Sequence, residues 1–357
     1  MTPPLMSLSQ IRRAVQKESV SARAHVQIDS VAAKTTREQQ PYCELTLADA
    51  CDRMTLRVWS DHPTYKTCSD FGGGEFLELN AEFHKHPQYG LEARPGKWTV
   101  RPLTEPEISE LLQGPAELRA KQATDWKFIT DTCARINDPR LRLLCETFMG
   151  EWGERFRRTA AARNYHHARR GGLVEHCAQM MRLAAGIAPL YPQLNADLLI
   201  AGILFHDSGK LWENSYSETG FVMGYDERGE LMGHISIGLE LVNSLWRKLG
   251  SEHPTEWKEL KPASEDVRMH LLHLIAAHHG EKGLGSPVEP KTPEAQALHY
   301  IDNLDAKLEM FFAGYAVAKP LATRIFDRVR PLPGNLVKSL EKFAPAADKG
   351  PGDGRLL

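Results

Sequence analysis

The 357-residue sequence contains no hydrophobic run that approaches the roughly 20 residues of a bilayer-spanning helix. Its N-terminus, where Arg12 and Arg13 lie among polar residues, lacks the apolar core of a secretory signal. Its 6 cysteines form no C-x-x-C pair, so neither a disulfide framework nor a cysteine-based zinc site is indicated. These absences argue against a membrane protein and predict a cytoplasmic protein with buried thiols.

The sequence also lacks an excess of charge, because 44 lysines and arginines nearly balance 46 aspartates and glutamates. The formal net charge of −2 gives no global basic field, so binding to nucleic acid would depend on a local groove. A hydrophobic content of 42% and a charged content of 25% are ordinary for a folded protein and exclude wholesale disorder. A chain of this length exceeds what one core usually serves and predicts two domains.

The first part of the chain, from Ala22 to about Leu103, has the pattern of β-strands. Its short runs alternate with period two, as in residues 54–59 (MTLRVW), and turn-rich breaks such as residues 72–74 (GGG) separate them. About five strands in about eighty residues suit a small closed barrel, and the OB-fold is the commonest barrel of that size that binds single strands. An SH3-like barrel is the alternative.

After Pro102 the apolar residues recur three or four positions apart, which predicts helices as far as about Phe312. We expect helices at 125–136, 139–158, 172–187, 195–206, 234–249, 264–278 and 293–313. We therefore predict a multidomain protein with a small all-β OB-fold barrel followed by an all-α domain. The expected divisions are an N-terminal segment at 1–21, the barrel at 22–105, a helical connector at 106–160, the all-α domain at 161–330 and a flexible tail at 331–357.

The strongest signal for chemistry is residues 205–210 (FHDSGK), which end an apolar helix. At a helix end, where glycine releases the backbone, the side chains of His206 and Asp207 can converge on one ion. His176 lies upstream on another apolar helix face. The alternative for such a histidine is a core imidazole that is hydrogen-bonded to a carbonyl or a carboxylate.

Further histidines and an aspartate follow downstream, with His234 at the start of a helix and His278-His279 at the end of another. Asp302 lies inside an apolar helix, where its charge would be costly to bury without a cation; exposure to solvent is the alternative. Imidazole and carboxylate without thiolate suit Mn, Fe, Co, Ni or Zn, and these candidates are too many for one ion. We therefore predict a centre of two divalent metal ions with the ligands His176, His206, Asp207, His234, His278, His279 and Asp302.

The order His176, His206-Asp207, Asp302 resembles the H…HD…D pattern of the HD superfamily of phosphohydrolases. The all-α domain is also similar to the YhaM family, whose members are bacterial 3′-to-5′ exoribonucleases with an N-terminal OB domain and a C-terminal HD domain. The similarity covers nearly the whole HD domain and, more loosely, the barrel. The matching segments are residues 164–167 (NYHH), 171–176 (GGLVEH), 233–236 (GHIS), 278–280 (HHG) and 300–307 (YIDNLDAK).

This resemblance implies a division of the ligands between two ions. His176, His206, Asp207 and Asp302 would bind one ion, with Asp207 bridging to the second. The second ion would be bound by His234 and His278, with His279 as a further candidate. Manganese is the first candidate among the metals.

The predicted mechanism uses a hydroxide that bridges the two cations, which lower its pKa and neutralise the phosphate oxygens. Asp207 would position this nucleophile, and Lys210 would stabilise the charge that develops on a phosphate oxygen. His166 is predicted to contact the nucleic acid and His167 to protonate the leaving oxygen. The alternatives are a solvated lysine at a helix end and surface histidines in a linker.

In the barrel, Arg57, Trp59 and Lys85 are the candidate nucleic-acid-binding residues, because aromatic and cationic side chains stack on bases and contact phosphates. A strand aromatic such as Trp59 has core packing as its alternative role.

The leading functional prediction is a metal-dependent phosphodiesterase that acts as a 3′-to-5′ exonuclease on single-stranded RNA or DNA. Its polarity comes only from the resemblance. One alternative is an HD phosphohydrolase of a small nucleotide or cyclic dinucleotide, and another is a nucleic-acid-binding protein with an inert HD domain. The apolar helix that ends near Phe312 is a candidate contact for a homo-oligomer.

Overall fold

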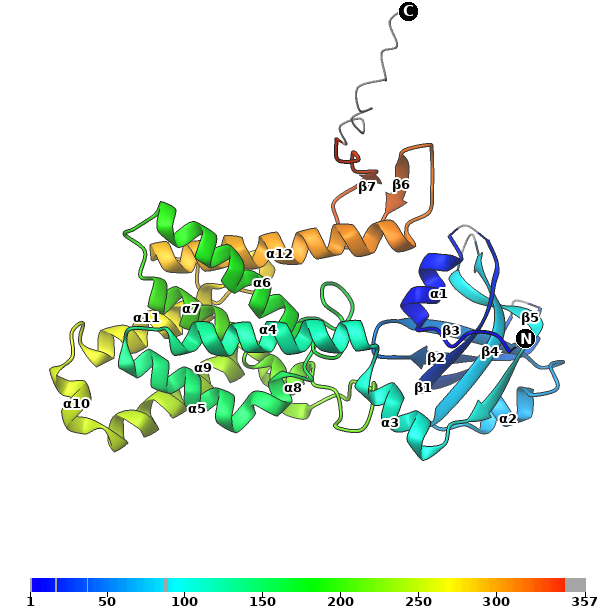
Figure 1. Ribbon diagram of the computed structural model, residues 1–357, viewed down its shortest axis with the longest axis horizontal. Helices are drawn as coiled ribbons and strands as arrows, with labels where there is room; N and C mark the ends of the chain where they lie inside the picture. Colours follow the sequence, from blue (N-terminus) through cyan, green and yellow to red (C-terminus); the bar gives the residue numbers. More distant parts are fainter. Residues whose placement is uncertain (1, 17, 37, 87–88, 344–357) are drawn as a thin grey trace, which may run out of the picture.

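The computed structural model describes residues 2–16, 18–36, 38–86 and 89–343. Figure 1 shows an elongated molecule with the N-terminal β part at one end and the helical part at the other. The expected order of a small β domain followed by helices is therefore confirmed. Within the described ranges, no helix combines the length and the apolar character needed to cross a bilayer.

The β part is a five-stranded antiparallel sheet with the order β3-β2-β1-β4-β5. The long strand β1 pairs with β4 through its first half and with β2 through its second half, with a register shift between Ile28 and Ser30. The outer strands β3 and β5 also contact each other, so the sheet curls towards closure. The strands are β1 (Val20–Thr35), β2 (Pro41–Ala48), β3 (Arg53–Trp59), β4 (Phe76–His86) and β5 (Gly90–Pro102).

The core of the β part follows from the alternation seen in the sequence, because successive side chains of a strand point to opposite faces. Cys43 and Leu45 of β2 are buried and lie opposite the buried Val58 and Leu56 of β3. The short helix α1 (Leu8–Ala14) adds buried side chains to this core, and α2 (Tyr65–Asp70) contributes a buried cysteine. Residues that alternate with the core positions, such as Arg57, face outward.

The helical part contains α3 to α12, and α4 to α12 surround a separate apolar core. The last long helix begins as its sequence indicates, since the side chain of Thr292 accepts a hydrogen bond from the N–H of Ala295 and Pro293 occupies the first turn. The helices are α3 (Glu105–Gln113), α4 (Ala116–Ala134), α5 (Pro139–Phe156), α6 (Gly172–Ile187), α7 (Ala196–Phe205), α8 (Lys210–Glu213), α9 (Glu227–Glu252), α10 (Pro254–Glu259), α11 (Ser264–Ala277) and α12 (Pro293–Val317).

Three parts of the helical region differ from the expected ranges. Helix α4 begins at Ala116, well before the expected residue 125. Helix α9 begins at Glu227 and is interrupted at Gly233, whose φ of 69° lies in the left-handed region that glycine adopts without strain. The segment expected as a tail from residue 331 includes strand β7 (Asn335–Val337), which pairs with β6 (Ile325–Arg328) and packs on α12. The rest of that expected tail, residues 344–357, lies outside the described residues.

The loop between α8 and α9 joins the helical part to the β part. The buried Phe221 packs beside Ala48 and Ala50. Its backbone N–H also donates to the side-chain oxygen of Gln27 on β1 at 2.5 Å. The two parts are therefore held together by both an apolar contact and a buried hydrogen bond.

Candidate metal centre

Five helices or their ends carry the predicted ligands to one place in the helical part. His176 lies in α6 and Asp302 in α12, whereas His206 and Asp207 follow the end of α7. His234 comes directly after the break in α9, and His278 with His279 directly after α11. The close approach of these elements needs Gly209, because a Cβ at that position would lie 1.9 Å from the carbonyl oxygen of His234.

All five candidate histidine ligands are oriented in the same way. Each ring has its Nδ1 beside an oxygen acceptor, so an N–H on Nδ1 leaves the lone pair on Nε2 at the other side of the ring. The acceptors are Asp305 Oδ2 for His176 (2.7 Å), Ile203 O for His206 (2.8 Å), Glu213 Oε2 for His234 (3.1 Å), Ile275 O for His278 (2.7 Å) and Leu284 O for His279 (2.9 Å).

The opposite ring atoms converge on Asp207 and Asp302. Nε2 of His206 lies 3.2 Å from Oδ2 of Asp207, and Nε2 of His176 lies 3.3 Å from Oδ1 of Asp302. Nε2 of His234 and of His278 lie 3.7 and 3.6 Å from Oδ1 of Asp207. Asp207 thus stands between the two pairs of rings.

This arrangement fits divalent cations. Nε2 of His176, His206, His234 and His278 and Oδ1 of Asp207 are buried without a hydrogen-bond partner among the described residues, which is costly unless a ligand satisfies them. Two compact groups of ligand atoms can be distinguished, one from His234, His278 and His279 and the other from His176, His206 and Asp207. Imidazole nitrogens and carboxylate oxygens are the donors that transition-metal dications take.

Neighbouring charges shift the pKa values of the residues in this cluster. Burial alone would raise the pKa of Asp207, but Lys210 and His206 hold it well below its usual range. Burial alone would lower the pKa of His176, but the carboxylates of Asp302 and Asp305 raise it to about 9, so a cation at Nε2 would displace a proton from this ring. Burial and the neighbouring His206 keep the pKa of His278 well below its usual value, so this ring is neutral and able to ligate.

Lys210 contacts the cluster through Asp207, with its Nζ 2.6 Å from Oδ2. Its side chain is nearly buried. The phosphate contact predicted for this lysine from the sequence stays a prediction. The ammonium fixes one oxygen of Asp207 and leaves the other facing His234 and His278.

The rings of His166 and His167 both lie close to the ring of His176, at 5.3 and 5.8 Å between centroids, but they differ in their contacts. His167 is buried, and its Nε2 lies 3.0 Å from Oδ2 of Asp305, the same oxygen that meets Nδ1 of His176. Among the described residues, Nδ1 of both histidines is buried without a hydrogen-bond partner. Burial and the nearby His176 lower the pKa of His166 to about 3, so its ring is neutral.

Two carboxylates of the centre were not predicted from the sequence. Asp305 bonds to Nδ1 of His176, and Glu213 bonds to Nδ1 of His234. Asp305 had a signal, since it follows Asp302 by three positions and therefore lies on the same face of α12. Glu213 had none, because its contact with His234 spans 21 residues and depends on how α8 packs against α9.

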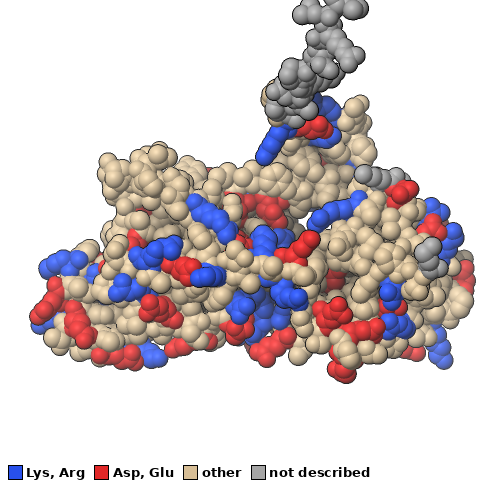
Figure 2. Space-filling model, viewed as in Figure 1, with Lys and Arg blue, Asp and Glu red and all other residues tan. Residues whose placement is uncertain are grey.

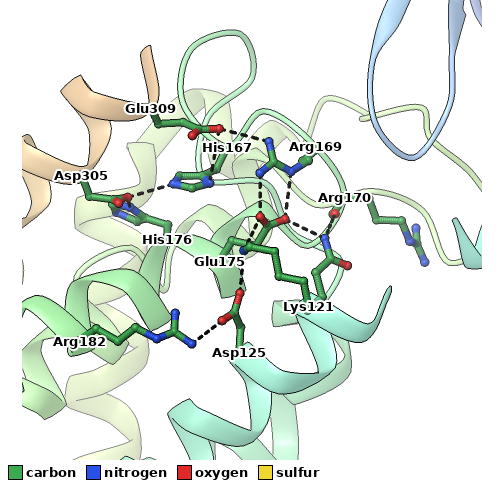
Figure 3. A network of polar contacts seen from close by, with 11 residues as sticks. Lys121, Asp125, His167, Arg169, Arg170, Glu175, His176, Arg182, Asp305 and Glu309 are labelled. Atoms are coloured by element: carbon green, nitrogen blue, oxygen red, sulfur yellow. Dashed lines mark hydrogen bonds and ion pairs between the residues drawn. The ribbon is translucent and has the colours of Figure 1, made fainter. Parts of the chain in front are cut away.

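A polar network behind His176 fixes the start of α6, and Figure 3 shows it continuing from Glu309 on α12 to Arg182 on α6. The buried Glu175 accepts from Arg169 at 3.0 and 2.7 Å and from Lys121 of α4 at 2.8 Å. Burial would raise the pKa of Glu175, but Arg169 outweighs it and lowers the pKa to about 2. Because Glu175 precedes His176, this charged cluster holds the ligand-bearing turn in place.

The barrel candidates divide between two sides of the sheet. Arg57 and Trp59 are alternate residues of β3, face outward and line a cavity of about 440 Å³ with Trp98. Arg57 is already paired with Glu44 and Glu92, both at 3.1 Å. Lys85 lies on the same face of β4 as the alternating core residues. Its Nζ donates to the side chain of Gln16 at 2.7 Å near α1. The structure therefore brings Arg57 and Trp59 together, but not Lys85.

Comparison with known proteins adds independent information. The family model described as "HD domain" matches residues 173–307. The chain is 37% identical over 291 residues to "3'-5' exoribonuclease YhaM" of Bacillus licheniformis, covering 79% of this chain and 83% of that one. It is 36% identical over 289 residues to the Bacillus subtilis protein of the same description, with the same coverage. Among solved structures, asparaginyl-tRNA synthetase from Pyrococcus horikoshii matches 42% of this chain and 36% of that chain at 12% identity, with a TM-score of 0.23 that is too low to assign a fold.

Proposed function

The chain belongs to the YhaM family, and we propose on this basis that it is a metal-dependent 3′-to-5′ exoribonuclease. The observation that carries the proposal is the set of buried Nε2 atoms and the Asp207 oxygen that converge without a hydrogen-bond partner among the described residues. A structural cluster would satisfy these atoms internally, whereas a hydrolytic metal centre needs them for cations. The HD domain found over residues 173–307 is consistent with that chemistry.

We propose two divalent ions, with manganese as the first candidate. His176, His206 and Asp302 would hold one, His234, His278 and His279 the other, and Asp207 would bridge them. When bound, such ions activate water at neutral pH and neutralise charge on the phosphate oxygens.

The residues of the chain position the groups of this centre. Lys210 holds Asp207 by one oxygen, so its other oxygen stays aimed at His234 and His278. Asp305 orients His176, and Glu213 orients His234, which fixes the tautomer of each ring. His166, which the sequence assigned to nucleic-acid contact, is the better placed of the two adjacent histidines to meet the scissile phosphate, because Nε2 of His167 is already hydrogen-bonded to Asp305.

We expect His166→Ala to lower the catalytic rate and His167→Ala to weaken metal binding. Loss of His166 should lower kcat by about 10²-fold with unchanged metal content, because a neutral ring at the phosphate is removed. Loss of His167 should instead weaken metal binding about tenfold or more, because Asp305 loses a hydrogen-bond partner. Kinetics and metal titration of both purified variants provide the measurement. A weaker metal affinity in His166→Ala, with normal affinity in His167→Ala, would reverse these roles.

We propose that the curled sheet is an OB-type barrel that captures single-stranded RNA. The support is its strand order, the pairing of β1 with both β2 and β4, and the approach of β3 to β5. The outward Trp59 beside a cavity offers a stacking surface for a base. Arg57 contributes less charge than expected, because Glu44 and Glu92 neutralise it.

We expect Trp59→Ala to weaken the binding of single-stranded RNA by about tenfold, because stacking of one base contributes about 1–3 kcal/mol. Fluorescence anisotropy with labelled RNA in the presence of a chelator measures this without cleavage. Lys85→Ala is the control, because Lys85 lies towards α1 and not on the Trp59 face. An equal loss in both variants would contradict the assignment of RNA to the outer face of β3.

A time course on 5′-labelled single-stranded RNA with Mn²⁺ tests the function itself. Same-sequence DNA and a chelator serve as parallel reactions. A metal-dependent ladder that shortens from the 3′ end supports the exoribonuclease. Hydrolysis of only mononucleotides or cyclic dinucleotides would replace it with a small-nucleotide phosphohydrolase, and binding without any hydrolysis would indicate an inert domain.

A further inference from the structure

A second cavity, of about 510 Å³, lies on the surface away from the metal ligands, none of which lines it. Its lining comes from four segments that are distant in sequence: the start of α4, the end of α5, the turn before α6 and the loop after α8. Figure 2 shows Lys and Arg side chains gathered in the middle of this face, where α4 and α5 approach the β part. The cationic lining residues are Arg119, Arg157, Arg158 and Arg170.

The cavity keeps a net positive charge. Glu154 and Glu218 also line it and pair with Arg157 at 2.9 Å and Arg158 at 3.1 Å, which leaves the other two arginines in excess. Arg119 and Arg170 have no carboxylate partner in the described part of the chain. Arg119 donates to the amide oxygen of Gln113 at 2.8 Å.

The guanidinium groups are also held in position by the backbone. Arg170 donates to the carbonyl oxygens of Ser217 at 2.5 Å and Gly220 at 3.0 Å. Arg158 donates to the carbonyl oxygen of Tyr216 at 3.2 Å. A carbonyl acceptor fixes a guanidinium without cancelling its charge, so these groups are pre-organised for an anion.

The positive charges of the neighbouring arginines repel one another. Burial, followed by the neighbouring Arg158, lowers the pKa of Arg170. A bound anion between these groups would relieve that repulsion. The planar guanidinium is suited to the tetrahedral oxygens of a phosphate, which it can contact with two N–H groups.

We infer that this arginine-lined cavity binds the phosphate group of a nucleotide, either within an RNA strand or free in solution. The RNA form of this inference rests on the proposed function, whereas the free-nucleotide form does not. The loop that supports Arg170 and Arg158 also carries Phe221, which bonds to Gln27 of the barrel. The site therefore lies at the junction where a strand held by the barrel would reach the helical part.

The test compares the full chain with Arg119→Gln/Arg157→Gln. Both arginines are exposed and donate no hydrogen bond to the backbone of the loop, so the substitution spares the junction. Arg135→Gln/Arg247→Gln removes the same charge from exposed positions elsewhere on the helical part and is the matched control. The probes are 5′-labelled single-stranded RNA, measured by anisotropy in chelator at several salt concentrations, and adenosine 5′-monophosphate, measured by calorimetry.

We expect the cavity variant, but not the control, to bind RNA about tenfold more weakly. The salt dependence should also fall, by about 0.7 in log–log slope for each phosphate that the variant no longer neutralises. Loss of adenosine 5′-monophosphate binding with unchanged RNA binding would assign the cavity to a free nucleotide. Unchanged binding of both probes overturns the inference. Binding is measured without metal and therefore does not depend on hydrolysis. If the unmodified protein binds RNA through the cavity but never hydrolyses it, the proposed exoribonuclease function is rejected and the inference about the cavity stands.

Discussion

Asp207→Asn should abolish the hydrolysis of single-stranded RNA, with a loss of more than about 10³-fold in kcat. The reason is that Asp207 faces both pairs of ligand rings, with one oxygen near His206 and the other near His234 and His278. Removing its charge affects both proposed ions together. The loss of activity should therefore exceed the 10–100-fold loss that is typical when a residue that only orients a ligand is replaced. The measurement is kcat with Mn²⁺ on labelled RNA, together with the metal content of the purified protein.

The stability of this variant must be measured as well, because Lys210 loses its buried partner. Breaking such a pair typically costs about 3–5 kcal/mol. If thermal unfolding shows that Asp207→Asn does not fold, Asp302→Asn provides the second test, since Asp302 meets His176 but is partly exposed. Full activity in either folded variant, once contaminating nuclease is excluded, would reject the proposed centre.

Asp305→Asn should weaken metal binding by about 10–100-fold without removing a ligand. Asp305 accepts from Nδ1 of His176 at 2.7 Å and lies 3.0 Å from Nε2 of His167, so the asparagine no longer fixes the tautomer and angle of either ring. Activity should therefore recover as the Mn²⁺ concentration rises, whereas Asp207→Asn should stay inactive at any concentration. Metal titration and the dependence of kcat on Mn²⁺ measure the difference.

Glu309→Gln is the matched control for Asp305→Asn, because it lies one turn further along α12. Its carboxylate is 3.9 Å from Nδ1 of His167 and 3.3 Å from Arg169, and it does not contact His176. We expect its metal affinity to change by less than about threefold. An equal loss in both variants would mean that the charge of this helix face, and not the orientation of His176, controls the centre.

Local sequence patterns predict much of the architecture. The alternation in residues 54–59 places Leu56 and Val58 in the barrel core, because a strand turns every second side chain to the same face. The start of α12 follows from Thr292 and Pro293, which satisfy the requirements of a first helical turn. The sequence pattern predicts a helix start at residue 234, whereas α9 begins at Glu227 and Gly233 interrupts it without ending it.

The sequence by itself determined which residue types lie at the helix ends. Imidazole and carboxylate groups are the side chains that bind divalent cations, and the apolar faces of the helices that carry them pack together. Only the tertiary structure decided how each residue is used. Asp305 meets His176 across 129 residues, and His167 is drawn to the same carboxylate across 138. Lys210 is directed to Asp207 by burial next to an opposite charge. These choices depend on distances between separate helices, and a local sequence pattern contains no information about such distances until the core has packed.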